Sequence, residues 1–161
     1  GRGPDLGRRV ADAYAAERDH RDVEWVAGAR EVMGSLSEHY RVGVVTNSPA
    51  DAARQKVDAA GVDEYAETVV FAGHDTPAKP APEPFDRALE ALDADPARAA
   101  HVGDSLQSDI AGANAAGLRS VLFAADGEGH RNEGHDADER TVPDNRIASM
   151  SALASLPWVD A

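Results

Sequence analysis

Residues 99–124 have the sequence AAHVGDSLQSDIAGANAAGLRSVLFA, and this stretch decides the fold class. Its apolar start, Ala99 to Val102, is typical of a buried strand and stops at Gly103-Asp104. The alanine-rich residues 107–116 follow the period of a helix, and Ser120 to Ala124 form a second apolar run. Two strands joined by a helix run parallel. The stretch therefore predicts a β-α-β unit.

The same alternation of strands and helices extends along the rest of the chain. Apolar runs predict strands at 42–45 and 68–72. Residues at helical spacing predict helices at 29–40, at 49–60 and after the Pro-rich loop 77–84. The residues expected on the inner faces of the first and third of these helices are Ala29, Val32, Met33, Leu36, Tyr40, Phe85, Ala88, Leu89 and Leu92. Strands alternating with helices in this way predict an α/β fold with a parallel sheet.

Local sequence signals place several element ends. Ser48 is expected to cap the helix at 49–60, with Pro49 as its first residue and Gly61 as its C-cap. The tail from Ile147 to Leu156 predicts a last short strand or turn followed by a helix.

The composition excludes several classes of protein. The chain has 161 residues, a formal net charge of −13 and no cysteine. This length suits one domain with its own core. Without cysteine there is no disulfide framework, thiolate zinc site or cysteine nucleophile. The negative charge argues against nucleic-acid binding, which needs clustered Lys and Arg. No apolar run approaches the roughly 20 residues that span a bilayer.

The basic residues are nearly all arginine, with lysine only at Lys56 and Lys79, and aspartate outnumbers glutamate. Such an acidic, Lys-poor, Ala-rich chain is similar to proteins from a salt-loaded cytoplasm. We therefore expect a cytoplasmic protein of halophilic composition whose stability rises with salt. Residue 1 is glycine rather than methionine, so we expect the natural protein to be longer.

Polar residues follow three of the predicted strands, at the strand ends where open parallel sheets bind ligands. Thr46 and Asn47 end the first strand, Lys79 follows the second, and Asp104 with Asp109 follow the third. We expect them to converge on a phosphoryl group. Thr46 and Asn47 would bond its oxygens, Lys79 would neutralise its charge, and Asp104 and Asp109 would hold Mg²⁺.

Each of these residues also has a structural interpretation. Thr often ends a strand and precedes a helix, so the position of Thr46 suits either role. Lys79 could lie on the surface of its loop, but a lysine kept in an arginine-rich chain favours a site that needs a compact ammonium. Asp104 could simply close a turn. The step of five residues to Asp109 favours a metal site, because both carboxylates then lie near one helix N-terminus.

The histidines and the polar segment 126–140 carry weaker signals. His74 and His101 are expected to be structural or incidental. The segment is expected to be a solvated loop, and a metal site within it is the less favoured alternative. The residues with ligand chemistry in that segment are His130, His135, Asp136 and Asp138.

Three motifs together resemble the haloacid dehalogenase (HAD) superfamily of hydrolases. The sequence 44–47 (VVTN) matches its strand-terminal Thr or Ser, Lys79 its lysine, and 102–117 (VGDSLQSDIAGANAAG) its acidic pair. The resemblance covers about residues 25–156 and implies a Rossmann-like parallel sheet. It implies a core at 25–161, with 1–24 as the remnant of a helical cap.

The sequence departs from the family in one respect. The family's first motif, Asp-x-Asp, follows its central strand and supplies the nucleophile that becomes phosphorylated, but no Asp-x-Asp follows an apolar strand here. We expect this exact chain, without that strand, to be inactive and to form two half-sheets with unpaired inner edges. On this basis it would fold poorly alone.

The resemblance implies a specific activity for the full-length protein. Family phosphatases keep an acid at the position of Asp104 for Mg²⁺, whereas the dehalogenases need no metal. We therefore expect a phosphoglycolate-phosphatase-like enzyme that acts on a small phosphorylated metabolite through an aspartyl-phosphate, with no nucleic-acid or membrane partner. One alternative is a non-catalytic relative that binds phosphate or a partner. A response-regulator-like domain fits poorly, because Lys79 precedes Asp104. The sequence fixes neither the substrate nor the oligomeric state.

Overall fold

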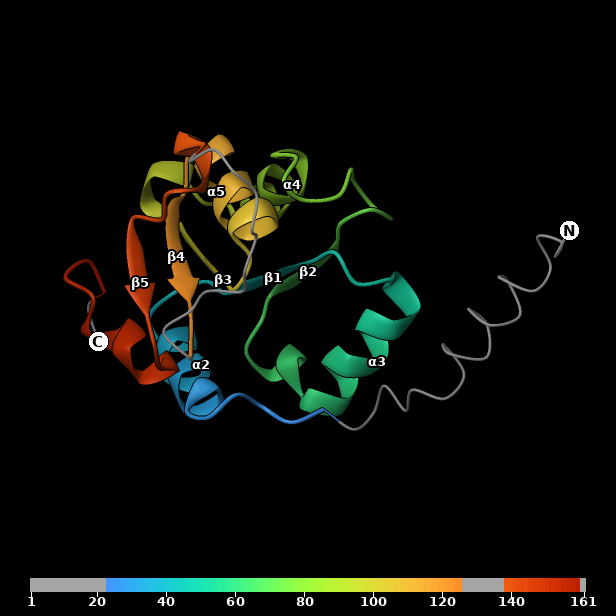
Figure 1. The fold of residues 1–161 in the computed structure, drawn as a ribbon. Coiled ribbons are helices and arrows are strands. Elements are labelled where there is room, and N and C mark those ends of the chain that lie inside the picture. Colours follow the sequence, from blue (N-terminus) through green and yellow to red (C-terminus); the bar gives the residue numbers. More distant parts are fainter. Residues whose placement is uncertain (1–22, 126–137, 160–161) are drawn as a thin grey trace, which may run out of the picture.

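The structure is a computed structural model, and it describes residues 23–125 and 138–159 (Figure 1). Its strands are β1 (Gly43–Thr46), β2 (Thr68–Phe71), β3 (Ala100–Gly103), β4 (Arg119–Phe123) and β5 (Asn145–Ile147). Its α-helices are α2 (Ala29–Ser37), α3 (Ala50–Ala60), α4 (Glu83–Leu92) and α5 (Ala111–Ala115). Shorter helical turns are η1 (Val62–Glu64), η2 (Pro96–Arg98), η3 (Leu106–Ile110), η4 (Glu139–Thr141) and η5 (Met150–Ser155). This element order confirms the predicted α/β class.

The strands form two parallel sheets. β1 pairs with β2, with Thr46 opposite Phe71, and β3, β4 and β5 pair in that order. Within the described residues, β1 and β3 each have one hydrogen-bonded neighbour and are not paired with each other. The β3-η3-α5-β4 segment is the parallel unit predicted from residues 99–124.

Helices cover both faces of the strands. In Figure 1, α4 and α5 lie on one side, and α2 and α3 lie on the other. On the α2 side, Val32 packs with Val121, Ile147 and Leu153. The largest fully buried side chains also include Phe85 of α4, Ile110 of η3 and Leu122 of β4. Each large apolar side chain buried in this way contributes about 1.5–3 kcal/mol, so the fold rests on contacts between these layers.

The predicted inner helix faces are mostly confirmed, with one error at the end of α2. Ala29, Val32 and all four predicted residues of α4 are buried. Tyr40 is 40% exposed because α2 ends at Ser37, three residues before it. The predicted helix at 29–40 is therefore too long.

The start of α3 also differs from the prediction. The helix begins at Ala50, and Pro49, rather than Ser48, is the N-cap residue, with no side-chain cap. The backbone N–H of Ser48 donates to Thr46 Oγ1 at 3.1 Å, so Ser48 belongs to the turn that leaves β1. The predicted C-cap is confirmed, since Gly61 has the left-handed φ of 64° that favours glycine.

The first and third strands are less buried than their apolar sequences predict. No residue of β1 or β3 is fully buried within the described structure, whereas Ser120, Val121 and Leu122 of β4 are. β4 has a strand on each side, whereas β1 and β3 each have one paired edge. Edge position is not the whole reason, because β2 also has one neighbour and buries Val70 and Phe71.

Several predictions fall on parts of the chain that lie outside the described residues. These are almost all of the predicted cap remnant 1–24 and most of the loop 126–140. Within that loop Asp138 is described, and it accepts hydrogen bonds from the backbone and guanidinium of Arg140. At the tail, β5 and η5 confirm a short strand followed by a helical turn.

Candidate active site

Thr46 ends β1, and its hydroxyl shapes the turn that follows. Thr46 Oγ1 accepts the backbone N–H of Ser48 at 3.1 Å. A hydroxyl that accepts one hydrogen bond still has its own O–H to donate. The side chain is half-buried at the carboxyl end of the strand. Thr46 therefore has a free donor at the edge where parallel sheets bind ligands.

Asn47 fixes the backbone of Lys79. Its Oδ1 accepts the N–H of Lys79 at 2.9 Å, and its Nδ2 donates to the carbonyl of Lys79 at 3.0 Å. This pair of bonds joins the end of β1 to the loop after β2, 32 residues away. The amide has a second N–H, so binding of phosphate by Asn47 remains a prediction.

The ammonium of Lys79 lies between the two sheets. It donates to the carbonyl of Val45 in β1 at 2.9 Å and to Asp109 Oδ1 at 2.6 Å. The side chains of Lys79 and Asp109 are each 8% exposed, so this ion pair is buried. The structural alternative, a surface lysine in a Pro-rich loop, is wrong. The prediction that Lys79 lies at the strand ends is supported by these contacts.

Asp109 is held by three donors. Oδ1 contacts Lys79 Nζ and also His101 Nε2, at 3.3 Å, while Oδ2 accepts the backbone N–H of Ser105 at 3.1 Å. Burial alone would raise the pKa of Asp109, but the hydrogen bonds from His101 and Lys79 outweigh it. The pKa of this carboxyl is therefore well below its ordinary value, and Asp109 is ionised near neutral pH.

The backbone around Asp109 requires glycine at position 103. The Asp109 side chain packs so closely over Gly103 that a Cβ atom there would overlap it. The turn η3 brings the carboxylate back over the strand end, with the backbone N–H groups of Asp109 and Ile110 both donating to Ser105 O. The sequence Gly-Asp-x-x-x-x-Asp thus places its second carboxylate beside the strand that carries the first.

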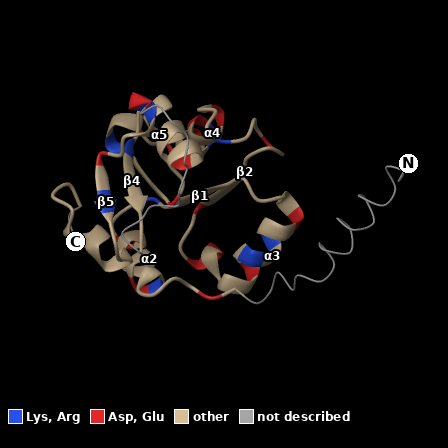
Figure 2. Ribbon diagram, viewed as in Figure 1, with Lys and Arg blue, Asp and Glu red and all other residues tan. Residues whose placement is uncertain are grey.

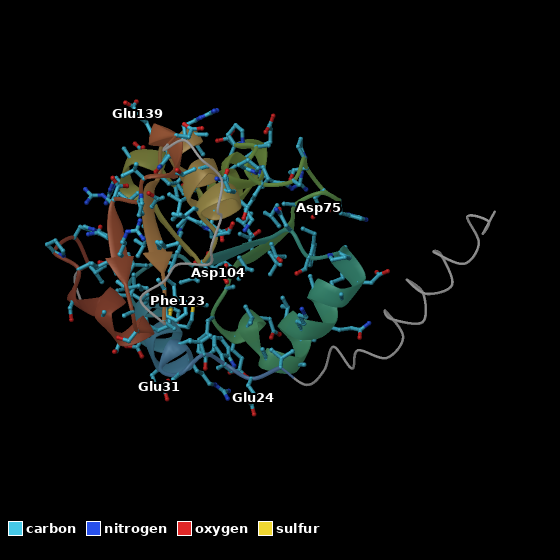
Figure 3. All side chains as sticks on the ribbon, in the orientation of Figure 1. Glu24, Glu31, Asp75, Asp104, Phe123 and Glu139 are labelled. Carbon is cyan, nitrogen blue, oxygen red and sulfur yellow. The ribbon has the colours of Figure 1, made fainter. Side chains whose placement is uncertain are left out.

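Asp104 is exposed at the carboxyl end of β3, and Figure 3 labels it in the middle of the view. It makes an interaction within the described structure. Its exposed position contrasts with that of Asp109, which is buried against Lys79. The two carboxylates that the sequence predicts as a pair therefore have different surroundings.

These surroundings decide how well a magnesium ion fits. Within residues 23–125 and 138–159, no group of three or more His, Asp or Glu side chains could hold a metal. Mg²⁺ in phosphoryl-transfer sites often takes only one or two carboxylates, with water and phosphate oxygens completing its shell. Asp104 suits such a site. Asp109 already neutralises an ammonium, so its share in binding a metal remains a prediction.

His101 is a residue of the site that sequence reasoning missed. The sequence predicts a structural or incidental role for His101, which stays a prediction, and the structure shows that its ring contacts Asp109. The one available signal was its place two residues before Gly103, on the strand that carries Asp104. Alternate residues of a strand face the same side of the sheet, so His101 and Gly103 share a side. The sequence does not show on which side of the sheet the Asp109 side chain lies.

Comparison with known protein families gives one match that covers most of the chain. The profile of the haloacid dehalogenase-like hydrolases matches residues 5–117. The chain belongs to this family.

Named relatives of this HAD chain include several phosphatases. It is 33% identical to a ribulose-1,5-bisphosphate 5-phosphatase of Halopiger xanaduensis, over 94% of the chain and 62% of the relative. It is 32% identical to a phosphoserine phosphatase of Thermus thermophilus, over 93% of the chain and 57% of the relative. The chain thus spans less than two thirds of the length of these relatives.

Solved structures confirm the Rossmann-like α/β fold. A 2-haloacid dehalogenase from Pseudomonas syringae superimposes with a TM-score of 0.71 at 29% identity, covering 96% of the chain and 63% of the neighbour. A HAD phosphatase from Thermococcus onnurineus has a TM-score of 0.67 at 27% identity, covering 81% and 57% respectively. None of the helices in the described ranges is long and apolar enough for a membrane span.

Proposed function

We propose that the full-length protein is a Mg²⁺-dependent phosphatase of small phosphorylated metabolites, working through an aspartyl-phosphate. The observation that carries this proposal is the buried Lys79–Asp109 pair beside the end of β1. A buried ammonium there can neutralise charge on a transferring phosphoryl group. The phosphatase names of the relatives support the same class of reaction.

The residues of this chain would bind the phosphoryl group and the metal ion. Thr46 would donate its free O–H to a phosphoryl oxygen, and the one ammonium proton of Lys79 that is not used by Val45 or Asp109 would contact a second oxygen. Asn47 would hold the Lys79 backbone in place and offer its remaining N–H. Asp104 would be the ligand of Mg²⁺, with Asp109 near it. Bound Mg²⁺ would supply charge neutralisation at the phosphoryl oxygens.

The nucleophile would come from the strand that carries the family's Asp-x-Asp motif, and no apolar run of residues 1–161 ends in that motif. We propose that the strand pairs between β1 and β3, whose neighbouring edges have no partner in the described structure. The first Asp of that motif would attack phosphorus and displace the alkoxide, which would take a proton from the motif's second Asp. The same second Asp would then take a proton from the water that hydrolyses the acyl phosphate and releases inorganic phosphate. We also propose that residues 1–24 are the remnant of a helical cap. A cytoplasmic location remains a prediction.

The experiment is hydrolysis of phosphomonoesters by the full-length protein. We expect p-nitrophenyl phosphate to be hydrolysed with Mg²⁺, the rate to be lost on chelation, and Asp104→Ala to lose at least 100-fold. Asp63→Ala, an exposed residue of η1, is the matched control. Hydrolysis by Asp104→Ala at the parental rate contradicts the role of this carboxylate, and release of chloride from a 2-chloro acid would favour a dehalogenase instead.

A non-catalytic relative is the alternative that we proposed from the sequence. It predicts that the full-length protein binds inorganic phosphate or vanadate without turning over any phosphomonoester. Calorimetric titration with vanadate, run beside the hydrolysis assay, separates the two functions.

A further inference from the structure

His101 contacts the carboxylate of the buried Lys79–Asp109 ion pair. Its Nε2 lies 3.3 Å from Asp109 Oδ1, the same oxygen that accepts Lys79 Nζ at 2.6 Å. The side chain of His101 is 15% exposed, and those of Asp109 and Lys79 are each 8% exposed. A buried carboxylate oxygen is therefore shared between an ammonium on one side and an imidazole on the other.

The ring of His101 is itself oriented by packing. The edge-to-face contact with Phe85 has a centroid separation of 4.9 Å and an interplanar angle of 85°. Phe85 is 1% exposed in α4, and its ring lies so close to Gly112 that a Cβ there would overlap it. This close packing of Phe85 restrains the plane of the imidazole ring.

The chemistry of Asp109 requires a proton on Nε2 of the His101 imidazole. An ionised carboxylate only accepts hydrogen bonds, so Nε2 of His101 is the N–H that donates to Oδ1. With Ser105 N–H on Oδ2, the carboxylate is restrained at both oxygens. Its rotation about the Cβ–Cγ bond is thereby blocked.

We infer that His101 is a positioning residue for the ammonium of Lys79, acting through Asp109. An ammonium has three N–H donors in a tetrahedral arrangement. Two of them are used, on Val45 O and on Asp109 Oδ1, so the direction of the third is set by where those two oxygens lie. Val45 O belongs to the backbone of a strand and is rigid. Asp109 Oδ1 is the adjustable partner, and His101 holds it in place.

This inference rests on the proposed function only for its effect on catalysis. The third N–H is the one available to a phosphoryl oxygen. Loss of the His101 donor would let Oδ1 turn away and would misdirect that N–H, while the positive charge would remain. Supporting residues of this kind typically change activity by about 10–100-fold.

The test compares two amide substitutions of His101 in the full-length protein. His101→Gln places an amide N–H near the position of Nε2, whereas His101→Asn is too short to reach Asp109. His74→Asn, an exposed histidine paired with Asp75 in the loop after β2, is the matched control. The readouts are kcat/KM for p-nitrophenyl phosphate, the melting temperature, and the ¹⁵N–¹H signal of the Lys79 ammonium, identified by its loss in Lys79→Arg.

We expect His101→Asn to lower kcat/KM about 10–100-fold and to broaden or shift the Lys79 signal. His101→Gln should recover most of the parental kcat/KM and most of the parental Lys79 signal. Its melting temperature should be similar to that of His101→Asn. Equal values for the two variants, or a parental Lys79 signal in His101→Asn, overturn the inference. If the parent hydrolyses no phosphomonoester, the proposed function fails, and the Lys79 signal still decides the role of His101. If His101→Asn melts below the assay temperature, the signal is recorded in the cold, where the same two outcomes apply.

Discussion

Lys79 Nζ lies 2.6 Å from Asp109 Oδ1, and this contact joins two parts of the fold that share no strand pairing in the described structure. Lys79 follows the β1–β2 sheet and also donates to Val45 of β1. Asp109 follows β3 of the other sheet. The candidate site is therefore also a structural link between the sheets, and changes there affect both stability and chemistry.

Lys79→Ala is expected to destabilise the fold. Removal of the ammonium leaves the Asp109 carboxylate buried with only His101 and the Ser105 N–H, and loss of one partner of a buried pair costs about 3–5 kcal/mol. Urea unfolding of the full-length protein measures the loss. Lys56→Ala, at the exposed second lysine, is the control and should stay within about 0.5 kcal/mol of the parent.

Thr46→Val is expected to lower kcat about 100-fold with a small change in folding. Valine keeps the shape of threonine but removes the O–H that we propose donates to the phosphoryl group, and loss of one such donor typically costs 10²–10³ in rate, to an order of magnitude. Thr46→Ser restores the hydroxyl and should recover activity. Equal rates for the two variants would show that the hydroxyl serves only the turn to Ser48.

We expect the ionisation of Asp109 to make the free energy of unfolding fall at low pH. Its pKa is held below the ordinary value by His101 and Lys79 against the opposing effect of burial. Its contribution is therefore fully present above about pH 3.9, the ordinary value for Asp, and is lost as the pH falls below that value. The free energy of unfolding of the parent should approach that of Asp109→Asn as the pH is lowered from about 5 to 2. A constant difference across that range contradicts the assignment.

Two glycines are expected to respond oppositely to alanine. Gly103→Ala would drive a Cβ into Asp109 and should cost about 1–3 kcal/mol. Gly34 lies within α2, where an added Cβ meets only Tyr65 Cε1 at 3.7 Å, so Gly34→Ala should stabilise by about 0.5–1 kcal/mol. Thermal melts of both variants give the comparison. A neutral Gly103→Ala would contradict the close packing of Asp109.

Salt is expected to stabilise the protein. The formal net charge is −13, and Figure 2 shows acidic residues distributed across helices and loops rather than gathered at one place. Repulsion among these charges weakens the compact state, and salt screens it within a Debye length of about 10 Å at 0.1 M. The melting temperature should rise from low to molar KCl. A flat profile would contradict this expectation, and NaCl at equal ionic strength separates screening from a specific effect of potassium.

The alternation of apolar strands with helices was enough to predict the parallel α/β class, because period and length are local properties of the sequence. Val121 and Leu122 in β4, and Phe85 and Leu89 in α4, are buried as their patterns predict. The motif residues Thr46, Lys79 and Asp104 were also visible in sequence, since Thr46 ends a strand, Lys79 lies in the loop after one, and Asp104 directly follows one. Element ends were less predictable: Ser48 is used by a turn, and α2 stops before Tyr40.

What the sequence could not give was the set of partners inside the site. Asn47 on the Lys79 backbone, Val45 O on its ammonium, and His101 on Asp109 are contacts between residues 8 to 34 positions apart. They depend on which way each side chain turns after the strands are aligned. Sequence alone determined which chemical groups arrive at the strand ends. The tertiary structure decided that Asp109 is the buried partner of Lys79 while Asp104 stays exposed, because the packing of Asp109 over Gly103 and its contact with His101 form only in the folded chain.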